Sequence, residues 1–249
     1  MRRAFGFRRR WFRSHRTPGR IRLTGKQWTW LVVFAVVSVI VATGVGTPHE
    51  PPRVDARVVA AARARLAGLR VLDRRPPHDV DYDRNAFGPA WTDAADVRGG
   101  RNGCDTRNDI LARDLAVTAR TATESCPDAV AAGSLTSPYT GRPISFRRGR
   151  ASAAVQIDHV VPLALAWDLG ASAWPQPRRW AFANDPSNLV AVDADSNQTK
   201  SDYEPARWMP PLRAFHCQYA VAFISVLAAY GLPVDAPSRD TLDEALRRC

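Results

Sequence analysis

Apolar residues in the second part of the chain recur at helical spacing and alternate with short apolar runs that are typical of strands. The helical patterns cover 54–70, 105–119, 164–169, 178–183, 215–230 and 238–248. The runs that predict strands cover 143–146, 153–158 and 189–192. Gly231 and Pro233 predict the end of the helix at 215–230, because neither residue continues a helix easily. This mixed order of helices and strands predicts an α+β fold.

Polar residues that can cap helices, and turn formers, mark the boundaries of these elements. The expected N-cap residues are Thr106, Asp195 or Ser196, and Ser238. Segments 73–101 and 133–143 are rich in turn formers and are expected to be irregular. Within the first segment, we expect Tyr82, Phe87 and Trp91 to pack as local core rather than to bind bases.

The stretch 27–48 contains no charged residue and predicts a membrane segment. Its 22 residues, at a rise of ~1.5 Å each, can cross a hydrocarbon layer of ~30 Å. Residues 1–26 carry ten basic side chains and no acidic one, which is typical of a cytoplasmic flank. Trp28 and Trp30 would lie at the level of the lipid headgroups. We therefore expect a basic cytoplasmic tail at 1–26, a single-pass anchor at 27–48, and the rest of the chain outside the cytoplasm.

A cleaved signal peptide is the main alternative, and it would make the protein secreted. Its basic segment would be unusually long, and no clean Ala-x-Ala site follows the apolar run. The segment Arg9-Arg10-Trp11-Phe12 resembles a twin-arginine export signal but lies far from that run. A buried soluble helix would leave the basic block unexplained. After this region we expect a linker and helix at 49–74 and one domain at 75–249.

The net charge of +11 is concentrated in the tail, since 11 − 10 leaves +1 for everything after Lys26. Global charge therefore does not indicate that the main domain binds nucleic acid, and a phosphate-binding surface must be local.

Four cysteines follow the export segment, and an even number in that position predicts disulfides. They are Cys104, Cys126, Cys217 and Cys249. Three pairings are possible, and we prefer Cys104–Cys126 with Cys217–Cys249 because each pair lies within one local segment. The rival hypothesis is a zinc site, but no cysteine or histidine pair stands at ligand spacing.

Three short motifs carry the chemistry that the sequence suggests. They are Asp158-His159-Val160-Val161-Pro162, then Asn188-Leu189, then Asn197-Gln198-Thr199-Lys200. Each motif starts at the end or the beginning of a predicted element, so a strand–strand–helix unit would bring them to one site. Phosphodiester hydrolysis needs a base near neutral pH, which a histidine provides. It also needs a cation at the phosphate, and Asp158 and Asn197 offer the oxygen ligands that Mg²⁺ or Mn²⁺ prefers.

These motifs resemble the HNH endonucleases, also called His-Me finger or ββα-metal nucleases. The resemblance is more specific to an exported actinobacterial branch, related to the C-terminal domain of GmrSD-type restriction endonucleases. Further segments that carry it are Cys104-Asp105-Thr106-Arg107-Asn108-Asp109 and Phe182-Ala183-Asn184-Asp185. It covers roughly residues 75–249, and it implies a ββα-metal core with surrounding helices. The 28 residues between His159 and Asn188 exceed a minimal HNH hairpin, so helices at 164–184 would be insertions.

The resemblance also implies a role for each site residue. His159 matches the general base, and Asn188 matches the middle asparagine that orients it. Asp158 and Asn197 match the ligands of one divalent cation, Mg²⁺ or Mn²⁺. Lys200 is expected to meet a phosphate oxygen, and so is Arg107, from the motif of the branch. The structural alternatives are a turn cap for Asp158, a helix N-terminal position for Asn197, a solvated helix face for Lys200, and a salt bridge that packs the helix for Arg107.

Three hypotheses of function remain open, and the weakest is another metal-dependent phosphodiesterase that uses the same site on a smaller substrate. The other two belong to different classes. The first is a metal-dependent endonuclease that hydrolyses DNA, with RNA as a further substrate, outside the cytoplasmic membrane. The second is a non-catalytic, disulfide-stapled envelope protein that binds a partner on an HNH scaffold. The joint presence of Asp158, His159, Asn188 and Asn197 favours the enzyme, because a scaffold does not need this set. A serine or cysteine nucleophile is not indicated, since no Gly-x-Ser-x-Gly motif occurs.

Overall fold

The computed structural model describes residues 24–26, 28–30, 32–33, 51–78 and 81–249. The chain divides into two units, Met1–Thr47 and Pro48–Cys249. Among the described residues, no helix is both long enough and apolar enough to cross a membrane. Most of the predicted tail at 1–26 and of the predicted anchor at 27–48 lies outside the described residues.

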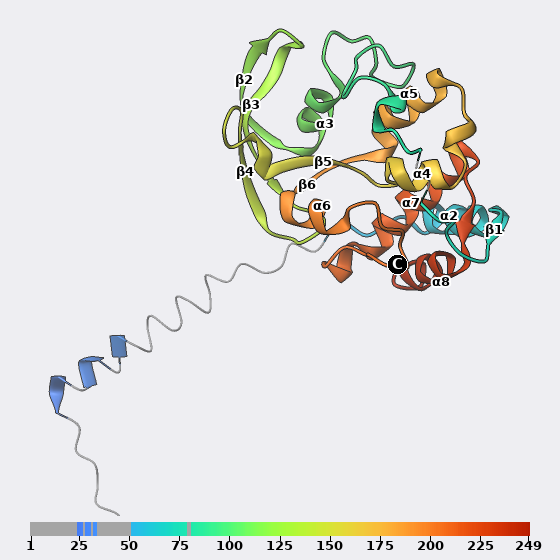
Figure 1. Cartoon of the computed structure of the whole chain (residues 1–249). Coiled ribbons are helices and arrows are strands. Elements are labelled where there is room, and N and C mark those ends of the chain that lie inside the picture. Colours follow the sequence, from blue (N-terminus) through green and yellow to red (C-terminus); the bar gives the residue numbers. More distant parts are fainter. Residues whose placement is uncertain (1–23, 27, 31, 34–50, 79–80) are drawn as a thin grey trace, which may run out of the picture. The chain divides into compact units, whose positions relative to one another are not determined.

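The second unit combines helices and strands, as the apolar pattern predicts (Figure 1). Its helices are α2 (Ala56–Gly68), α3 (Thr106–Asp114), α4 (Leu163–Asp168), α5 (Gln176–Asn184), α6 (Ala194–Lys200), α7 (His216–Tyr230) and α8 (Ala236–Arg247). Its strands are β1 (Val71–Leu72), β2 (Ala116–Thr123), β3 (Cys126–Thr136), β4 (Pro143–Arg147), β5 (Val155–His159), β6 (Leu189–Asp193) and β7 (Val234–Asp235). Short 3-10 helices include η1 (Arg84–Phe87) and η4 (Pro186–Asn188).

The strands of the described part form three small sheets. Strands β2, β3 and β4 make an antiparallel sheet, and β1 pairs with β7 in parallel. Strands β5 and β6 form an antiparallel pair in which Asp158 lies opposite Val190 and His159 opposite Leu189. Helix α6 begins directly after β6, so two paired strands and one helix follow one another around the predicted site.

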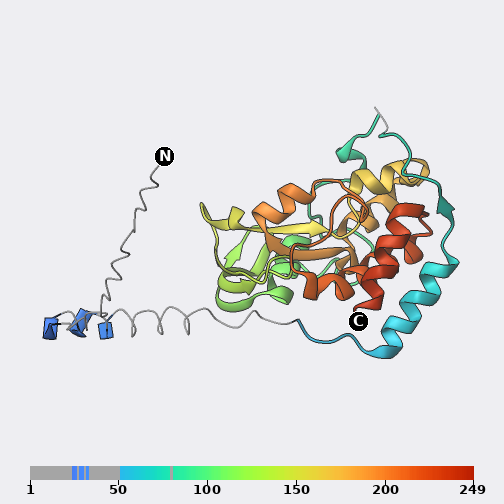
Figure 2. The same ribbon diagram turned by 90° about the horizontal axis from the view of Figure 1, so that it is seen from below.

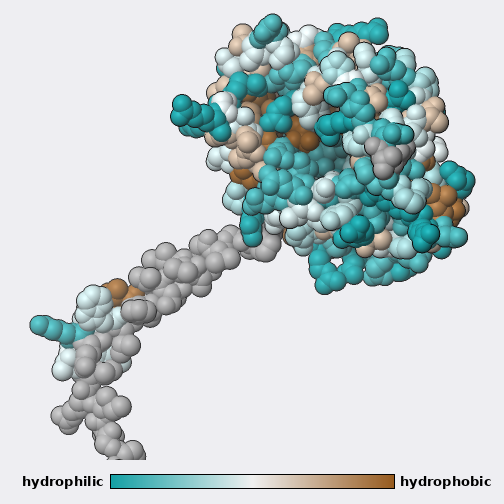
Figure 3. All heavy atoms as spheres, in the orientation of Figure 1, coloured by the Kyte–Doolittle hydropathy of each residue, from teal (hydrophilic) through white to brown (hydrophobic). Residues whose placement is uncertain are grey.

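Two apolar clusters hold these elements together. The larger cluster draws on α2, α4, α5, α7 and α8, and Figure 2 shows α2 running beside the two C-terminal helices. The smaller cluster fills the space between α3 and the strands, with Leu111, Phe146 and Leu189 among its members. Hydrophilic residues cover most of the face seen in Figure 3. The pair β5–β6 contributes residues to both clusters and therefore lies between them.

The predicted helix at 105–119 ends early, at Asp114. The chain then forms a hairpin of β2 and β3, which the sequence pattern did not predict. Strand β3 includes part of the region at 133–143 that was expected to be irregular. Strand β2 is largely exposed on both faces, so it shows no alternating apolar pattern. Its β-branched residues, including Val117 and Thr121, favour a strand once the sheet forms.

Aspartates cap three helices one to three residues before the expected N-caps. Asp105, Asp193 and Asp235 accept hydrogen bonds from the backbone nitrogens of Asn108, Ser196 and Ser238, respectively. The expected caps Thr106, Asp195 or Ser196, and Ser238 therefore lie inside their helices. At the other end of α7, Gly231 ends the helix with a left-handed backbone (φ 62°), as expected.

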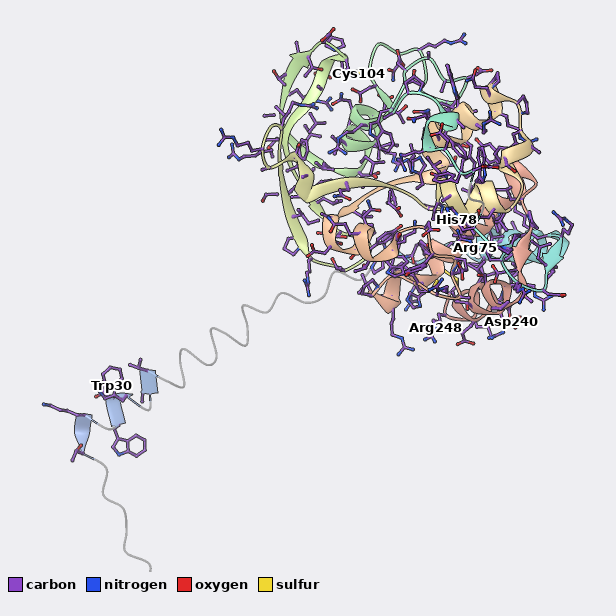
Figure 4. The ribbon with its side chains drawn as sticks, viewed as in Figure 1. Trp30, Arg75, His78, Cys104, Asp240 and Arg248 are labelled. Atoms are coloured by element: carbon purple, nitrogen blue, oxygen red, sulfur yellow. A yellow bond between two sulfur atoms is a disulfide. The ribbon has the colours of Figure 1, made fainter. Side chains whose placement is uncertain are left out.

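The structure contains two disulfides, Cys104–Cys126 and Cys217–Cys249. These are the pairs that local spacing in the sequence favours. The first joins the start of α3 to the β2–β3 hairpin, and Figure 4 marks Cys104 beside that hairpin. The second joins α7 to the end of α8.

Candidate active site

The four predicted site residues of the strand–strand–helix unit lie on or beside its three elements. Asp158 and His159 are the last two residues of β5, and Asn188 immediately precedes β6. Asn197 lies in the middle of α6. Because β5 and β6 run antiparallel, the end of one strand and the beginning of the other meet at the same edge.

Asn188 is fully buried and holds the loop that follows His159. Its side-chain oxygen accepts a hydrogen bond from the Val161 nitrogen at 2.8 Å. Its side-chain nitrogen donates to the Val161 oxygen at 3.2 Å. Its own backbone oxygen accepts from the Val160 nitrogen at 2.8 Å. Three bonds therefore fix the chain directly after His159, and both polar ends of the amide are used.

His159 is held on two sides. Its Nε2 lies 2.8 Å from the carbonyl oxygen of Ala183, and its ring stacks on Trp91 at 5.7 Å with an interplanar angle of 10°. A carbonyl only accepts hydrogen bonds, so Nε2 carries the proton and Nδ1 is the basic nitrogen. Burial lowers the pKa of His159 to about 3, and the positive charge of Arg84 acts in the same direction. The ring is therefore neutral at the pH of most solutions, and its Nδ1 carries no proton.

Asp158 is buried and tied to two partners from distant parts of the chain. Lys200 Nζ lies 2.9 Å from its Oδ1 and 2.8 Å from its Oδ2, and the Tyr139 hydroxyl donates to Oδ2 at 2.5 Å. Lys200 is fully buried and also donates to the backbone oxygen of His159 at 2.6 Å. Burial raises the pKa of Asp158 and lowers that of Lys200, because both charges have left water.

One open cavity brings much of this chemistry together, with a volume of about 490 Å³. Its wall contains Asp158, His159 and Asn197, whose side-chain nitrogen donates to Gln156 Oε1 at 2.7 Å. The remaining lining includes His78, Tyr82, Arg84 and Asp202. Asn188 lies behind this wall rather than in it, since it does not line the cavity.

The two residues expected to bind substrate lie elsewhere. Lys200 points into the protein and pairs with Asp158. Arg107 donates to the backbone oxygens of Ser152, at 3.3 Å, and Val155, at 2.9 Å, so it fastens α3 to the start of β5. Burial lowers the pKa of Arg107, and nearby Arg148 adds to that effect. Both cations therefore support the structure around β5, and neither lines the cavity.

The sequence analysis did not predict the part of the cavity wall that comes from residues before α3 in the chain. His78, Tyr82 and Arg84 line it, and Trp91 stacks on the catalytic candidate His159, although this segment was expected to supply local core. The expected local core is also present, because Phe87 is buried and the partly buried Tyr82 and Trp91 pack against the two apolar clusters. No apolar periodicity places these side chains. The packing of η1 against α4 and α5 positions Arg84, and Asp168 holds His78.

The donors on the cavity wall are of the type that a magnesium-like ion uses. Asp158 offers a carboxylate and Asn197 an amide, and Mg²⁺ often takes one or two protein ligands beside water and phosphate. Within the described residues, no group of three or more histidine, cysteine, aspartate or glutamate side chains could hold a metal ion. A cation at this wall would therefore depend on few protein ligands, and it would share Asp158 with Lys200.

Comparison with known proteins shows the family of the chain. Residues 105–242 match the C-terminal domain of the GmrSD restriction endonucleases. The chain therefore belongs to this GmrSD-related, HNH-type family. A protein of Arthroderma benhamiae (strain ATCC MYA-4681 / CBS 112371), described as an uncharacterized secreted protein, is 36% identical over 225 residues. The match covers 90% of this chain and 100% of that protein. No solved structure matches the chain.

Proposed function

We propose that the protein is a metal-dependent endonuclease that hydrolyses phosphodiester bonds in DNA, and that RNA is a further substrate. In this proposal β5, β6 and α6 form the ββα-metal core. The observation that supports it best is the state of His159, a neutral, immobilised histidine on a cavity wall that also carries Asp158 and Asn197.

His159 acts as the general base. Its Nδ1 takes a proton from the attacking water, while Nε2 stays bonded to Ala183. Asn188 positions the base by holding Val160 and Val161. Asp158 and Asn197 would hold the divalent cation, which supplies positive charge beside the phosphate when it is bound.

Arg84 takes the substrate-binding role that the sequence assigned to Lys200 and Arg107. It is exposed on the cavity wall and close enough to His159 to influence its pKa. A guanidinium there can donate two parallel hydrogen bonds to a phosphate. Lys200 instead fixes Asp158 and the backbone of His159.

The proposal places this activity outside the cytoplasmic membrane, either on an anchored or on a secreted protein. Two disulfides are typical of oxidising compartments. The fungal relative is described as secreted, which favours export by analogy.

The test uses the full chain, purified with its disulfides intact, and plasmid DNA with Mg²⁺, with Mn²⁺ or with EDTA. Wild type is compared with His159→Ala and with His216→Gln. His216 is a matched control, because it bonds the Pro210 oxygen and does not line the cavity. Cleavage that requires metal and His159, and survives His216→Gln, is the expected result. If folded wild type and His159→Ala are equally inert on DNA and RNA, the envelope binding protein becomes the better hypothesis.

A further inference from the structure

Hydrolysis of a phosphodiester needs a proton donor as well as a base. The leaving oxygen departs with an electron pair, and an alkoxide is a poor leaving group until it is protonated. His159 only removes a proton from water in the proposed function. Besides His159 and the two aspartates, three ionisable side chains line the same cavity, His78, Tyr82 and Arg84.

Two of these groups are poor proton donors. Arginine does not release its proton in proteins near neutral pH. Burial raises the pKa of Tyr82 above its ordinary value, so its hydroxyl holds its proton more firmly. Histidine is the side chain that most often serves in general acid–base catalysis, which leaves His78 as the suitable donor.

The orientation of His78 is fixed by a buried carboxylate. Its Nδ1 lies 3.1 Å from Asp168 Oδ1 and 3.2 Å from Oδ2. The Asp168 side chain is fully buried, whereas the His78 side chain is 50% exposed. A carboxylate only accepts, so Nδ1 carries a proton and Nε2 is the nitrogen that exchanges with the surroundings. The same division of labour between an aspartate and a histidine operates in catalytic triads.

Asp168 is itself held in place by Arg75. The guanidinium donates to Asp168 Oδ2 from Nε at 2.9 Å and from Nη2 at 2.6 Å. It also reaches Asp202 at 2.7 Å and Glu204 at 3.1 Å, in the segment that follows α6. Figure 4 labels Arg75 and His78 next to each other. This network links Arg75 and His78 to α4 and to the chain that follows α6. The ring of Tyr82 packs near the imidazole of His78, with ring centroids 5.5 Å apart.

We propose that His78 is a second catalytic histidine, the general acid of the proposed nuclease, oriented by Asp168. The water oxygen forms a bond to phosphorus and gives its proton to His159 Nδ1. The bond from phosphorus to the leaving oxygen breaks, and that oxygen keeps the electron pair and takes a proton from His78 Nε2. One water is consumed for each bond cleaved. Afterwards His159 returns its proton to solvent, and His78 takes one up.

This inference rests on the proposed function, and its test separates the two. His78→Gln, His159→Ala and His216→Gln are compared with wild type on DNA and on the 4-nitrophenyl phosphodiester of thymidine, with Mg²⁺ present. Nitrophenolate leaves without a proton, so it does not need a general acid. Circular dichroism checks that each variant is folded.

We expect His78→Gln to lose about 100-fold or more in the rate on DNA, and less than about twofold on the nitrophenyl ester. His159→Ala should lose activity on both substrates, and His216→Gln on neither. A DNA rate for His78→Gln equal to that of wild type overturns the inference, and so does an equal loss on both substrates, because His78 would then support binding or folding. In either case, loss of cleavage activity in His159→Ala would still support the proposed function. Inactive wild type on both substrates would overturn the proposed function and the inference together.

Discussion

The ammonium of Lys200 bridges both carboxylate oxygens of Asp158 at 2.9 and 2.8 Å, and both residues are buried. One residue lies at the end of a strand and the other ends a helix 42 positions later. The pair therefore ties β5 to α6 and holds in place the carboxylate that is proposed to bind the metal. Removal of either charge leaves the other one buried without its partner.

Lys200→Met should destabilise the fold by about 3–5 kcal/mol, because Asp158 then keeps a buried charge without compensation. Urea unfolding monitored by circular dichroism measures the change. The double variant Lys200→Met/Asp158→Leu is the control, and it should recover most of the loss since neither charge remains. Equal stability of Lys200→Met and wild type would show that the pair does not form.

Lys200→Met should also respond more strongly to metal. Lys200 competes with a cation for Asp158, so Mn²⁺ should raise the unfolding midpoint of the variant more than that of wild type. Thermal unfolding with Mn²⁺ and with EDTA measures this difference. An equal rise of the unfolding midpoint with Mn²⁺ in both proteins would contradict the role of Asp158 as a metal ligand.

Asn188→Ala should lower both stability and the rate of catalysis. It removes two side-chain hydrogen bonds to the buried backbone of Val161, at about 1–3 kcal/mol for each polar group left unsatisfied. The loop after His159 then loses its support, and kcat should fall more than KM changes. Ser187→Ala, at an exposed neighbouring position, is the matched control. An unchanged kcat in a folded Asn188→Ala protein would contradict the positioning role.

Arg84→Ala should weaken the interaction with DNA. The loss of a charge-assisted hydrogen bond of about 1.5–3 kcal/mol corresponds to a roughly 10- to 100-fold lower kcat/KM. The salt dependence of binding should flatten, by about one unit in the log–log slope, because one phosphate contact is lost. Arg98→Ala, at a position outside the cavity, serves as control. A slope equal to that of wild type would show that Arg84 does not contact phosphate.

The cap of α6 should make stability depend on pH. Burial alone would raise the pKa of Asp193, but hydrogen bonds from Ser137, Ser196 and Thr140 outweigh it and hold the pKa below the ordinary 3.8. A lowered pKa in the folded state means that the stabilisation is fully present above pH 3.8 and is lost as the pH falls through the lower value. Asp193→Asn should therefore be less stable than wild type at pH 7, and the gap should narrow in acid.

Urea midpoints of Asp193→Asn at pH 7 and in acid provide this measurement. Asp195→Asn, which removes another carboxylate from the same helix, controls for net charge. A difference in stability between Asp193→Asn and wild type that stays constant with pH would mean that the Asp193 carboxylate does not cap the helix.

Local sequence signals account for the elements that carry the site, but not for its whole wall. Apolar runs mark β5 and β6, and the Asp158-His159 and Asn188 motifs stand at their ends. The burial of Lys200 has no local signal, because its partner Asp158 lies on another element, where Tyr139 also holds the carboxylate. A lysine on a short helix is otherwise typical of a solvated or phosphate-binding side chain.

The hairpin of β2 and β3 and the segment around His78 were harder to predict for different physical reasons. Strand β2 is exposed on both sides, so burial leaves no periodic trace in its sequence. His78 lies outside the helices and strands. It is held by Asp168, which Arg75 contacts from 93 residues away in the sequence. Contacts across such distances depend on the finished fold, so the pattern of neighbouring residues does not contain them.

The immobility of His159 has a consequence for substrate choice. Trp91 covers one face of its ring and Ala183 holds its Nε2, so the imidazole has a fixed orientation. In the proposed nuclease, the nucleic acid must therefore adapt its shape to bring the scissile phosphate and its attacking water to a fixed Nδ1. Because DNA sequences differ in the energy of such deformation, the sites of cleavage should follow the local deformability of the DNA rather than a recognised base sequence.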